Sequence, residues 1–250
     1  MSQYFIASIS DLAQYQECPM CQRDCFKQIS KKEYECIADD FSKYATERNI
    51  SSDSRASGII VHNIMEWVLE NGMDKSDERI AEVNYAMNDL SKGALNNSLA
   101  HHFLKHLLPN SIHDARVQKV ISQTIPMLRR LKFHINRTEP ESIETERDVL
   151  MKYVIGSNYI AIIGRIDLIL KSNGKNEAVE YKTGKWINED KWWYQLTAYA
   201  SCLTDVVKIT IIHPIQGKSK QVTNISFKPY LTEIFSGDCE HIIDCHSLIE

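Results

Sequence analysis

The sequence predicts an α/β protein in which a mostly helical segment precedes a core built on one covered sheet. Apolar residues recur with a helical period through roughly the first 135 residues, whereas β-branched residues concentrate in short runs after them. These runs give the order three strands, one helix, then one or two strands, which is typical of a sheet covered by helices. A chain of 250 residues with 43% hydrophobic composition can bury such a core.

The N-terminal segment carries start and stop signals of several helices. Residues 8–17 begin with serines that can cap a helix and lead into a Cys-Pro pair that would end it. Residues 55–71 place apolar side chains on one side and lead into an Asn-Gly pair, a common helix stop. Two or three further helices are expected within residues 77–108 and 113–135.

The strands are delimited by β-branched runs and turn residues. We predict them at residues 146–155, 159–170, 178–181, 207–213 and 221–227. A Gly-Ser-Asn run connects the first two strands. A helix is expected at residues 189–203 with Asn188 as its cap, and the tail from residue 230 onward is weakly helical.

Composition excludes several classes of protein. The formal net charge of −4 gives no overall basic field, so nucleic acid would have to bind a local basic patch. No apolar run approaches the roughly 20 residues of a membrane span, and residues 1–9 lack the basic start of a secretory signal. We therefore expect a cytoplasmic protein without a membrane partner. Seven cysteines, an odd number, favour reduced thiols or metal ligands over a disulfide framework.

One predicted hairpin brings two carboxylates together. Asn173 and Gly174 lie between two strand patterns, and both residue types tolerate the positive φ angles of a two-residue turn. Asp167 and Glu180 lie equally far from this turn on either side, so antiparallel pairing places them directly opposite each other. Such partners have Cβ atoms about 5 Å apart, and two negative charges repel there by about 3 kcal/mol at an effective dielectric constant of about 20.

A divalent cation would stabilise this pair, and carboxylate oxygens suit Mg²⁺ or Mn²⁺. Lys182 lies two residues beyond Glu180 and therefore on the same strand face, where its ammonium group can neutralise a phosphate or orient a water. The alternative is a solvent-facing polar stripe in which Lys182 forms a surface ion pair with Glu180. A five-residue loop in place of the two-residue turn would also break the pairing.

Two helical pairs extend the constellation. His62 lies one turn after Gly58, and glycine allows close approach to another backbone, so His62 is a candidate third ligand that would favour Mn²⁺. A buried, hydrogen-bonded core histidine is its alternative. Gln195 and Tyr199 share a helix face just after the third strand, where they can contact phosphate or a base. An ordinary amphipathic helix is the alternative there.

Five short motifs, in this order, resemble the PD-(D/E)xK nuclease superfamily and specifically its RecB-like branch, which includes CRISPR-associated and phage RecB-like exonucleases. Residues 8–19 resemble the entry motif that ends in Cys-Pro, and residues 58–62 the Gly-x-x-x-His helix. Residues 164–167 resemble the Gly-x-x-Asp strand, residues 180–182 the Glu-x-Lys strand, and residues 195–199 the Gln-x-x-x-Tyr helix. Each motif is weak alone, and five in order are specific.

The resemblance implies a restriction-endonuclease-like core, a mixed sheet flanked by helices, at residues 141–250. An N-terminal helical lobe at residues 1–140 would carry the Cys-Pro and Gly-x-x-x-His motifs. The implied catalytic residues are Lys182, Asp167 and Glu180. The implied metal ligands are His62, Asp167, Glu180 and, through its carbonyl, Tyr181. The implied DNA contacts are Gln195, Tyr199, Arg165 and Lys185, with an ion pair to a neighbouring acid as the alternative for Arg165.

The cysteines suggest a further metal centre. Several RecB-like enzymes hold an iron–sulfur cluster through one cysteine in the Cys-Pro motif and three near the C-terminus. Cys18 matches the first of these, but the tail contains only Cys239 and Cys245. A second set could hold an iron–sulfur cluster or zinc, although its spacing matches no standard zinc ribbon: Cys18, Cys21, Cys25 and Cys36. Reduced thiols are the alternative.

The resulting hypothesis is a Mg²⁺- or Mn²⁺-dependent DNA exonuclease that hydrolyses phosphodiester bonds from single-stranded ends, in recombination, repair or defence. A metal-activated water would attack in line, and Lys182 would stabilise the charge of the transition state. One alternative is a structure-specific endonuclease subunit of a DNA-processing or CRISPR-type complex, with a protein partner. Another is a non-catalytic DNA-binding module with a nuclease fold. A third is a cysteine–metal protein whose N-terminal site binds a partner.

Overall fold

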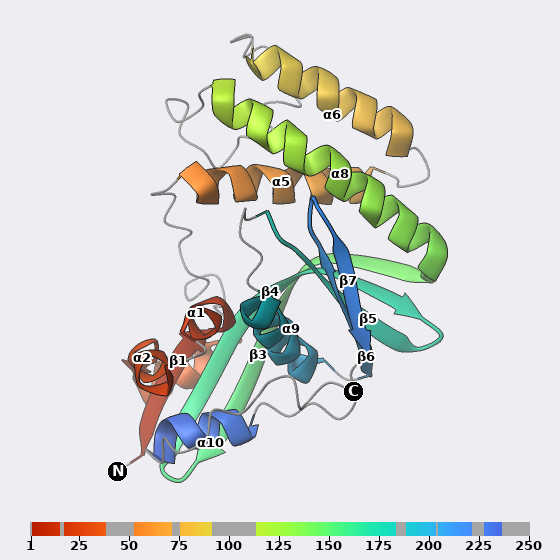
Figure 1. Cartoon of the computed structure of the whole chain (residues 1–250). Coiled ribbons are helices and arrows are strands. Elements are labelled where there is room, and N and C mark those ends of the chain that lie inside the picture. Colours follow the sequence, from red (N-terminus) through yellow and green to blue (C-terminus); the bar gives the residue numbers. More distant parts are fainter. Residues whose placement is uncertain are drawn as a thin grey trace.

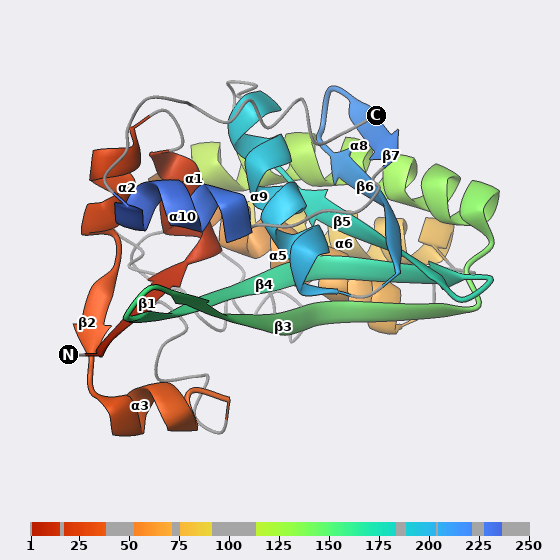
Figure 2. The same cartoon turned by 90° about the horizontal axis from the view of Figure 1, so that it is seen from below.

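The computed structural model describes residues 2–15, 18–38, 53–71, 76–91, 114–183, 189–203, 205–221 and 228–236. Within these ranges, a seven-stranded mixed sheet lies between two groups of helices (Figures 1 and 2). The predicted α/β class, with a mixed sheet flanked by helices, is therefore confirmed. No helix in these ranges has both the length and the apolar composition that crossing a membrane requires.

The sheet is organised around β4, the longest strand. The strands are β1 (Gln3–Ser8), β2 (Lys27–Ile29), β3 (Ser142–Ile155), β4 (Asn158–Ser172), β5 (Lys175–Tyr181), β6 (Val206–Ile212) and β7 (Gly217–Gln221). They follow the order β2-β1-β4-β5-β6-β7, and β3 pairs with β4 as well. The β1–β4 and β5–β6 pairs are parallel, and the others are antiparallel.

Helices cover both faces of the sheet. They are α1 (Ile9–Gln14), α2 (Pro19–Asp24), α3 (Lys31–Cys36), α5 (Asp53–Glu70), α6 (Ser76–Ser91), α8 (Asp114–Thr138), α9 (Glu189–Cys202) and α10 (Lys228–Ser236). One face packs against α5 and α8, with α6 lying along α8 on the outside (Figure 1). The other face packs against α1, α9 and α10.

Two apolar cores therefore lie on opposite sides of the sheet, and the alternation of the strands assigns residues to them. In β5, Ala178 belongs to the core beneath α9, whereas its neighbour Val179 belongs to the core beneath α5 and α8. In β4, Leu168 and Leu170 flank Ile169 and lie in the core opposite to it. Successive side chains of a strand point to opposite faces, so a strand covered on both sides has no polar face.

Most predicted elements are present with small shifts of their ends. The helices predicted at residues 55–71 and 189–203 are α5 and α9, and the predicted break at the Cys-Pro pair is confirmed because Cys18 caps α2 and Pro19 begins it. Ser8 caps α1, with its Oγ accepting from the backbone N–H of Asp11 at 3.1 Å. The fifth strand begins earlier than predicted, as β7, while residues 222–227 and the predicted cap Asn188 lie outside the described residues.

The strands β1 and β2 were not predicted, because the sequence was interpreted as helical up to about residue 135. β1 is short and covered on both faces, with Ile6 packing near α3 and Ala7 in the core beneath α9, so it shows no alternation. Its parallel partner lies more than 150 residues away in β4, at positions such as Ile162. The division into a lobe at 1–140 and a core at 141–250 stays a prediction, with the addition that β1 and β2 belong to the sheet.

The turn that the carboxylate pairing depends on is confirmed. Asn173 and Gly174 have φ angles of 52° and 71°, as a two-residue turn with two left-handed residues requires. The ladder between β4 and β5 joins Ser172 with Lys175 and continues to Leu168 with Val179. The next position in this register is Asp167 opposite Glu180.

Candidate active site

The site lies where β4 changes its partner. β1 pairs with β4 as far as Ile163 and then leads into α1, whereas β5 pairs with β4 only from Leu168 onward. Between these two ladders, residues 164–167 have no partner among the described strands on that edge. A side chain replaces the missing ladder there, because the backbone N–H of Tyr181 donates to Oδ2 of Asp167 at 2.6 Å. The divergence of β1 and β5 thus leaves room for polar side chains inside the fold.

Asp167 and Glu180 form a buried carboxylate pair, with exposed fractions of 5% and 4%. Burial raises the pKa of Glu180 and the charge of Asp167 raises it further, to about 7, despite the nearby Lys182. Burial also acts to raise the pKa of Asp167, but the charge of His62, together with Lys182 and the N–H of Tyr181, holds this pKa below its ordinary value. Near neutral pH, the second negative charge of the pair therefore costs free energy of folding.

Lys182 is joined to this pair inside the protein. Its Nζ lies 2.7 Å from Oε1 of Glu180 and 2.7 Å from Oε1 of Gln195. The Lys182 side chain is 16% exposed and that of Glu180 5%, so the solvent-facing stripe does not describe this arrangement. Two of the three N–H donors of the ammonium group are directed by these contacts, which fixes the direction of the third.

Gln195 and Tyr199 hold Glu180 and Lys182 from α9. Nε2 of Gln195 donates to Oε1 of Glu180 at 3.0 Å and to the hydroxyl of Tyr199 at 2.9 Å. Both side chains are buried, so their contacts are with the carboxylate–lysine constellation. Their predicted contact with DNA stays a prediction.

His62 reaches the pair from the other face of the sheet, on α5. Its Nδ1 lies 3.2 Å from Oδ1 of Asp167 without the geometry of a hydrogen bond. Burial would lower the pKa of His62, but the charge of Asp167, with those of the nearby glutamates, raises it. A Cβ at Gly58 would lie 3.3 Å from Oγ1 of Thr183, so glycine allows α5 to approach the end of β5 closely.

Sequence reasoning missed one member of the site, Glu146 of β3. Ligand atoms of His62, Glu146 and Asp167 all lie within 4.8 Å of one another. The sequence shows a Gly-Ser-Asn run between β3 and β4, but the turn has only two residues, Gly156 and Ser157, and the ladder joins Ile155 with Asn158. The counting applied to the other hairpin places Glu146 opposite Asp167.

These residues fit a divalent cation. Oε2 of Glu180 and Nδ1 of His62 are both buried and have no hydrogen-bond partner among the described residues. A buried polar atom without a partner costs free energy, which a bound cation would recover. Carboxylate oxygens with one imidazole nitrogen suit Mg²⁺ or Mn²⁺, and the imidazole favours Mn²⁺. Asp167, Glu180 and His62 could hold this ion, and the carbonyl of Tyr181 stays a predicted ligand.

Gly164, the glycine of the Gly-x-x-Asp strand, is required by the packing of α9 and α1 against β4. A Cβ at this position would lie 2.6 Å from Cε1 of Tyr199 and 3.0 Å from Cδ1 of Ile9. The Tyr199 ring is buried and hydrogen-bonded, so it has little freedom to move away. The glycine therefore allows Tyr199 to support the site.

We expect Gly164→Ala to lower the free energy of unfolding by about 2 kcal/mol, because overfilled cores typically lose this much. Urea unfolding followed by circular dichroism measures the change. Gly217→Ala is the matched control, since a Cβ at Gly217 meets nothing closer than 3.8 Å and should leave stability nearly unchanged. Equal stability of the two variants would contradict this explanation of Gly164.

Arg165 and Lys185 are the two basic residues predicted to contact DNA. Nε of Arg165 lies 2.6 Å from Oδ1 of Asp148, and its Nη1 lies 3.9 Å from Oε2 of Glu146. The structure therefore contains the ion pair that was the alternative for Arg165, and the side chain is still 41% exposed. Lys185 lies outside the described residues. Contact of either residue with DNA stays a prediction.

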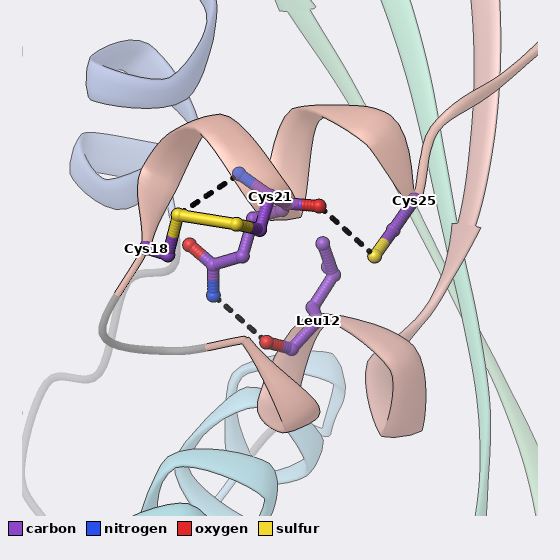
Figure 3. The surroundings of a disulfide bond; sticks show 5 residues. Leu12, Cys18, Cys21 and Cys25 are labelled. Carbon is purple, nitrogen blue, oxygen red and sulfur yellow. Dashed lines mark hydrogen bonds between the residues drawn. A yellow bond between two sulfur atoms is a disulfide. The ribbon is translucent and has the colours of Figure 1, made fainter.

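Two of the N-terminal cysteines are joined by a disulfide, between Cys18 and Cys21 (Figure 3). The two residues occupy the cap and the first turn of α2, with Cα atoms 5.3 Å apart. The expectation of reduced thiols is therefore wrong for this pair. Sγ of Cys25 donates to the carbonyl of Cys21 at 3.5 Å, and Cys36 is exposed. Because thiolates are the ligands of zinc and iron–sulfur clusters, such a centre at these four cysteines would require reduction of the disulfide.

One comparison with known proteins identifies a family for this chain. The family model described as the PD-(D/E)XK nuclease superfamily matches residues 7–211. No curated protein matches the chain. Two solved structures are similar: SSO0001, with 20% identity over 49% of this chain and a TM-score of 0.33, and protein VC1899 from Vibrio cholerae, with 12% identity over 66% and a TM-score of 0.25. The chain spans 63% of the first and 48% of the second.

Proposed function

Because the chain belongs to the PD-(D/E)XK nuclease superfamily, we propose that it is a Mg²⁺- or Mn²⁺-dependent deoxyribonuclease of the RecB-like branch that degrades DNA from single-stranded ends. Members of the superfamily are nucleases. The observation that carries the proposal is the buried pair of Asp167 and Glu180 with Lys182 bound to it, and a Glu180 oxygen that no described residue satisfies. Buried carboxylates with a strongly raised pKa are typical of functional sites.

The proposed ligands come from the sheet and from the helical layer on one of its faces. Asp167 and Glu180 lie on adjacent strands, and His62 comes from α5. When bound, the cation would polarise a phosphate and lower the pKa of a water molecule. The protein positions this group before substrate arrives, because Asp167 is held by the N–H of Tyr181, and Glu180 by Gln195 and Lys182.

Lys182 supplies positive charge at the scissile phosphate. Two acceptors fix its ammonium group at 2.7 Å, which leaves its third N–H for a phosphate oxygen or a water molecule. A donor held in position before the reaction stabilises developing negative charge without reorganisation, an effect worth about a hundredfold to a thousandfold in rate. Gln195 acts as a positioning residue, since it binds both Glu180 and Lys182.

The substrate class follows from the family, and the finer assignments follow from the five motifs. Exonucleolytic cleavage of single-stranded ends is the main proposal, with Arg165, Lys185, Gln195 and Tyr199 as candidate DNA contacts. A structure-specific endonuclease subunit that acts with a protein partner shares every residue of the constellation. The two differ in whether a DNA end is required.

The test compares end-labelled linear single-stranded DNA with circular single-stranded DNA, using the full chain with Mn²⁺, with Mg²⁺ or with EDTA. We expect metal-dependent loss of the linear substrate alone. Lys182→Ala should reduce the rate by at least about a hundredfold, because it removes a fixed positive charge from the reacting phosphate. Lys175→Ala is the matched control, because Lys175 lies at the other end of β5, beside the turn.

The outcomes separate the alternatives. Cleavage of the circle would favour the endonuclease over the exonuclease and keep the metal-dependent site. Cleavage that survives EDTA or Lys182→Ala would contradict the proposed site. Absence of cleavage of either substrate with both metals would contradict the proposal for the chain acting alone.

A further inference from the structure

Glu146 lies in β3, directly across the sheet from Asp167, on the side of β4 opposite to β5. The antiparallel ladder joins Thr145 with Leu168 and Arg147 with Ile166, so Glu146 and Asp167 face each other in register. Asp167 therefore has a glutamate as its neighbour on both sides, Glu180 in β5 and Glu146 in β3. This arrangement places three carboxylates in a row across adjacent strands, with His62 above them from α5.

The backbone turns at Glu146 in a way that few strand residues do. Its φ angle is 49°, in the left-handed region that favours glycine, although the ladder continues on both sides without an extra residue. The side chain is 19% exposed, and its ligand atom lies within 4.8 Å of those of His62 and Asp167. Like-charged carboxylates this close repel, so a fold that keeps both charged requires positive charge between them.

One atom of this cluster, and one of the neighbouring Glu180, are buried without a hydrogen-bond partner among the described residues. Oε2 of Glu180 belongs to a side chain that is 95% buried and has no hydrogen-bond partner among the described residues. Nδ1 of His62 is buried and in the same condition, although it lies 3.2 Å from Oδ1 of Asp167.

We infer that Glu146 is a further ligand of the divalent cation, contributed by β3 alongside His62 and Asp167. The inference rests on the proposed metal-dependent function and adds a residue that none of the five motifs contains. Two carboxylates and one imidazole have ligand atoms within 4.8 Å of one another, and Glu180 is the proposed fourth ligand. Carboxylate oxygens suit Mg²⁺ and Mn²⁺. Arg165 acts here as a positioning residue, because it contacts both Asp148 and Glu146 on β3.

The test is the binding of Mn²⁺ alone to the purified full chain, measured by isothermal titration calorimetry. We expect Glu146→Gln to raise the Kd for Mn²⁺ by about tenfold or more, since even groups that only support a ligand change metal affinity by about this much. Glu144→Gln is the matched control, because Glu144 is an exposed carboxylate two residues away in the same strand. It should change the Kd by less than about twofold.

Glu146→Gly is a second variant, which is expected to fold as the wild type does. Glycine adopts the left-handed φ angle without strain, so this variant keeps the backbone and loses the side chain with its carboxylate. We expect the melting temperature of the metal-free Glu146→Gly protein to equal or exceed that of the wild type. The increase in melting temperature that Mn²⁺ produces should be smaller than in the wild type.

The outcomes distinguish this inference from the proposed function. Weaker Mn²⁺ binding in both Glu146 variants, with normal binding by Glu144→Gln, would establish the ligand. If the wild type and both Glu146 variants bind Mn²⁺ equally, whereas Asp167→Asn does not, the inference is overturned and the proposed function stands. If the wild type binds no Mn²⁺, both are overturned.

Discussion

Glu180→Gln is expected to make the metal-free protein more stable above pH 7 and at the same time to abolish cleavage. The buried carboxyl group of Glu180 has its pKa raised to about 7, first by burial and then by the charge of Asp167. A glutamine has nearly the same shape and carries no charge, and its carbonyl oxygen can still accept from Lys182 and Gln195 in place of Oε1. The change therefore removes the electrostatic cost and keeps the packing.

The direction of the pH dependence follows from the raised pKa. The ordinary value is 4.5, so the folded protein holds the Glu180 proton more tightly than the unfolded chain does. The free energy of unfolding of the metal-free wild type should therefore fall as pH rises from 4.5 to about 7, and the full loss should be present above that. A shift of this size corresponds to about 3 kcal/mol, which Glu180→Gln should recover at pH 8.

The measurement is urea unfolding of both proteins in EDTA at pH 5 and pH 8. We expect a difference in stability at pH 8 that largely disappears at pH 5. With Mn²⁺ the order should reverse, because binding to the folded state stabilises only a protein that retains its ligands. Cleavage by the variant should fall by at least about a hundredfold, as expected when a metal ligand is lost. A variant that is less stable than the wild type at pH 8 in EDTA would contradict the unfavourable effect that the charge of Asp167 is expected to have on ionised Glu180.

Local sequence was sufficient to predict the carboxylate pair, because the pair depends on one turn. Asn173 and Gly174 can both adopt positive φ angles, and that choice fixes the register of every residue back to Asp167 and Glu180. Lys182 follows from strand alternation alone. Glu146 lies opposite Asp167 through a second two-residue turn, which the Gly-Ser-Asn run does not distinguish from a three-residue connection.

The features that sequence could not provide depend on contacts between distant segments. Strand β1 forms because β4 offers a parallel edge, and its ladder ends at Ile163, before β4 begins to pair with β5 at Leu168. That change of partner creates the space for the site, and no local pattern around Gly164 signals it. The contact between Gly164 and Tyr199 likewise appears only when α9 is placed on the sheet. Turn residues fix the pairing within each hairpin. The separation of β1 from β5 along β4 depends on the whole sheet.

The largest loss of stability is expected from another buried carboxylate outside the Asp167–Glu180 pair, Glu177, which lies three residues before Glu180 in β5. Its Oε1 lies 2.8 Å from Nε2 of His134 in α8 and 3.2 Å from Nζ of Lys208 in β6, and it also accepts from the hydroxyl of Thr210. The side chain is 6% exposed. Burial acts to raise the pKa of Glu177, but the hydrogen bonds from His134 and Thr210 and the charges of His134 and Lys208 lower it overall. This carboxylate thus ties α8 to the sheet.

Glu177→Ala should lower the free energy of unfolding by about 3 kcal/mol at pH 7, because it leaves the buried partners of Glu177 without their acceptor. Since the pKa of Glu177 is lowered from 4.5, its contribution is present above that pH and is lost as pH falls through the folded-state value. The difference between variant and wild type should therefore shrink in urea unfolding below pH 4.5. Glu144→Ala, which breaks an exposed ion pair with Arg147, should change stability by less than about 0.5 kcal/mol. Equal losses in the two variants would mean that the Glu177 network contributes no more than a surface pair.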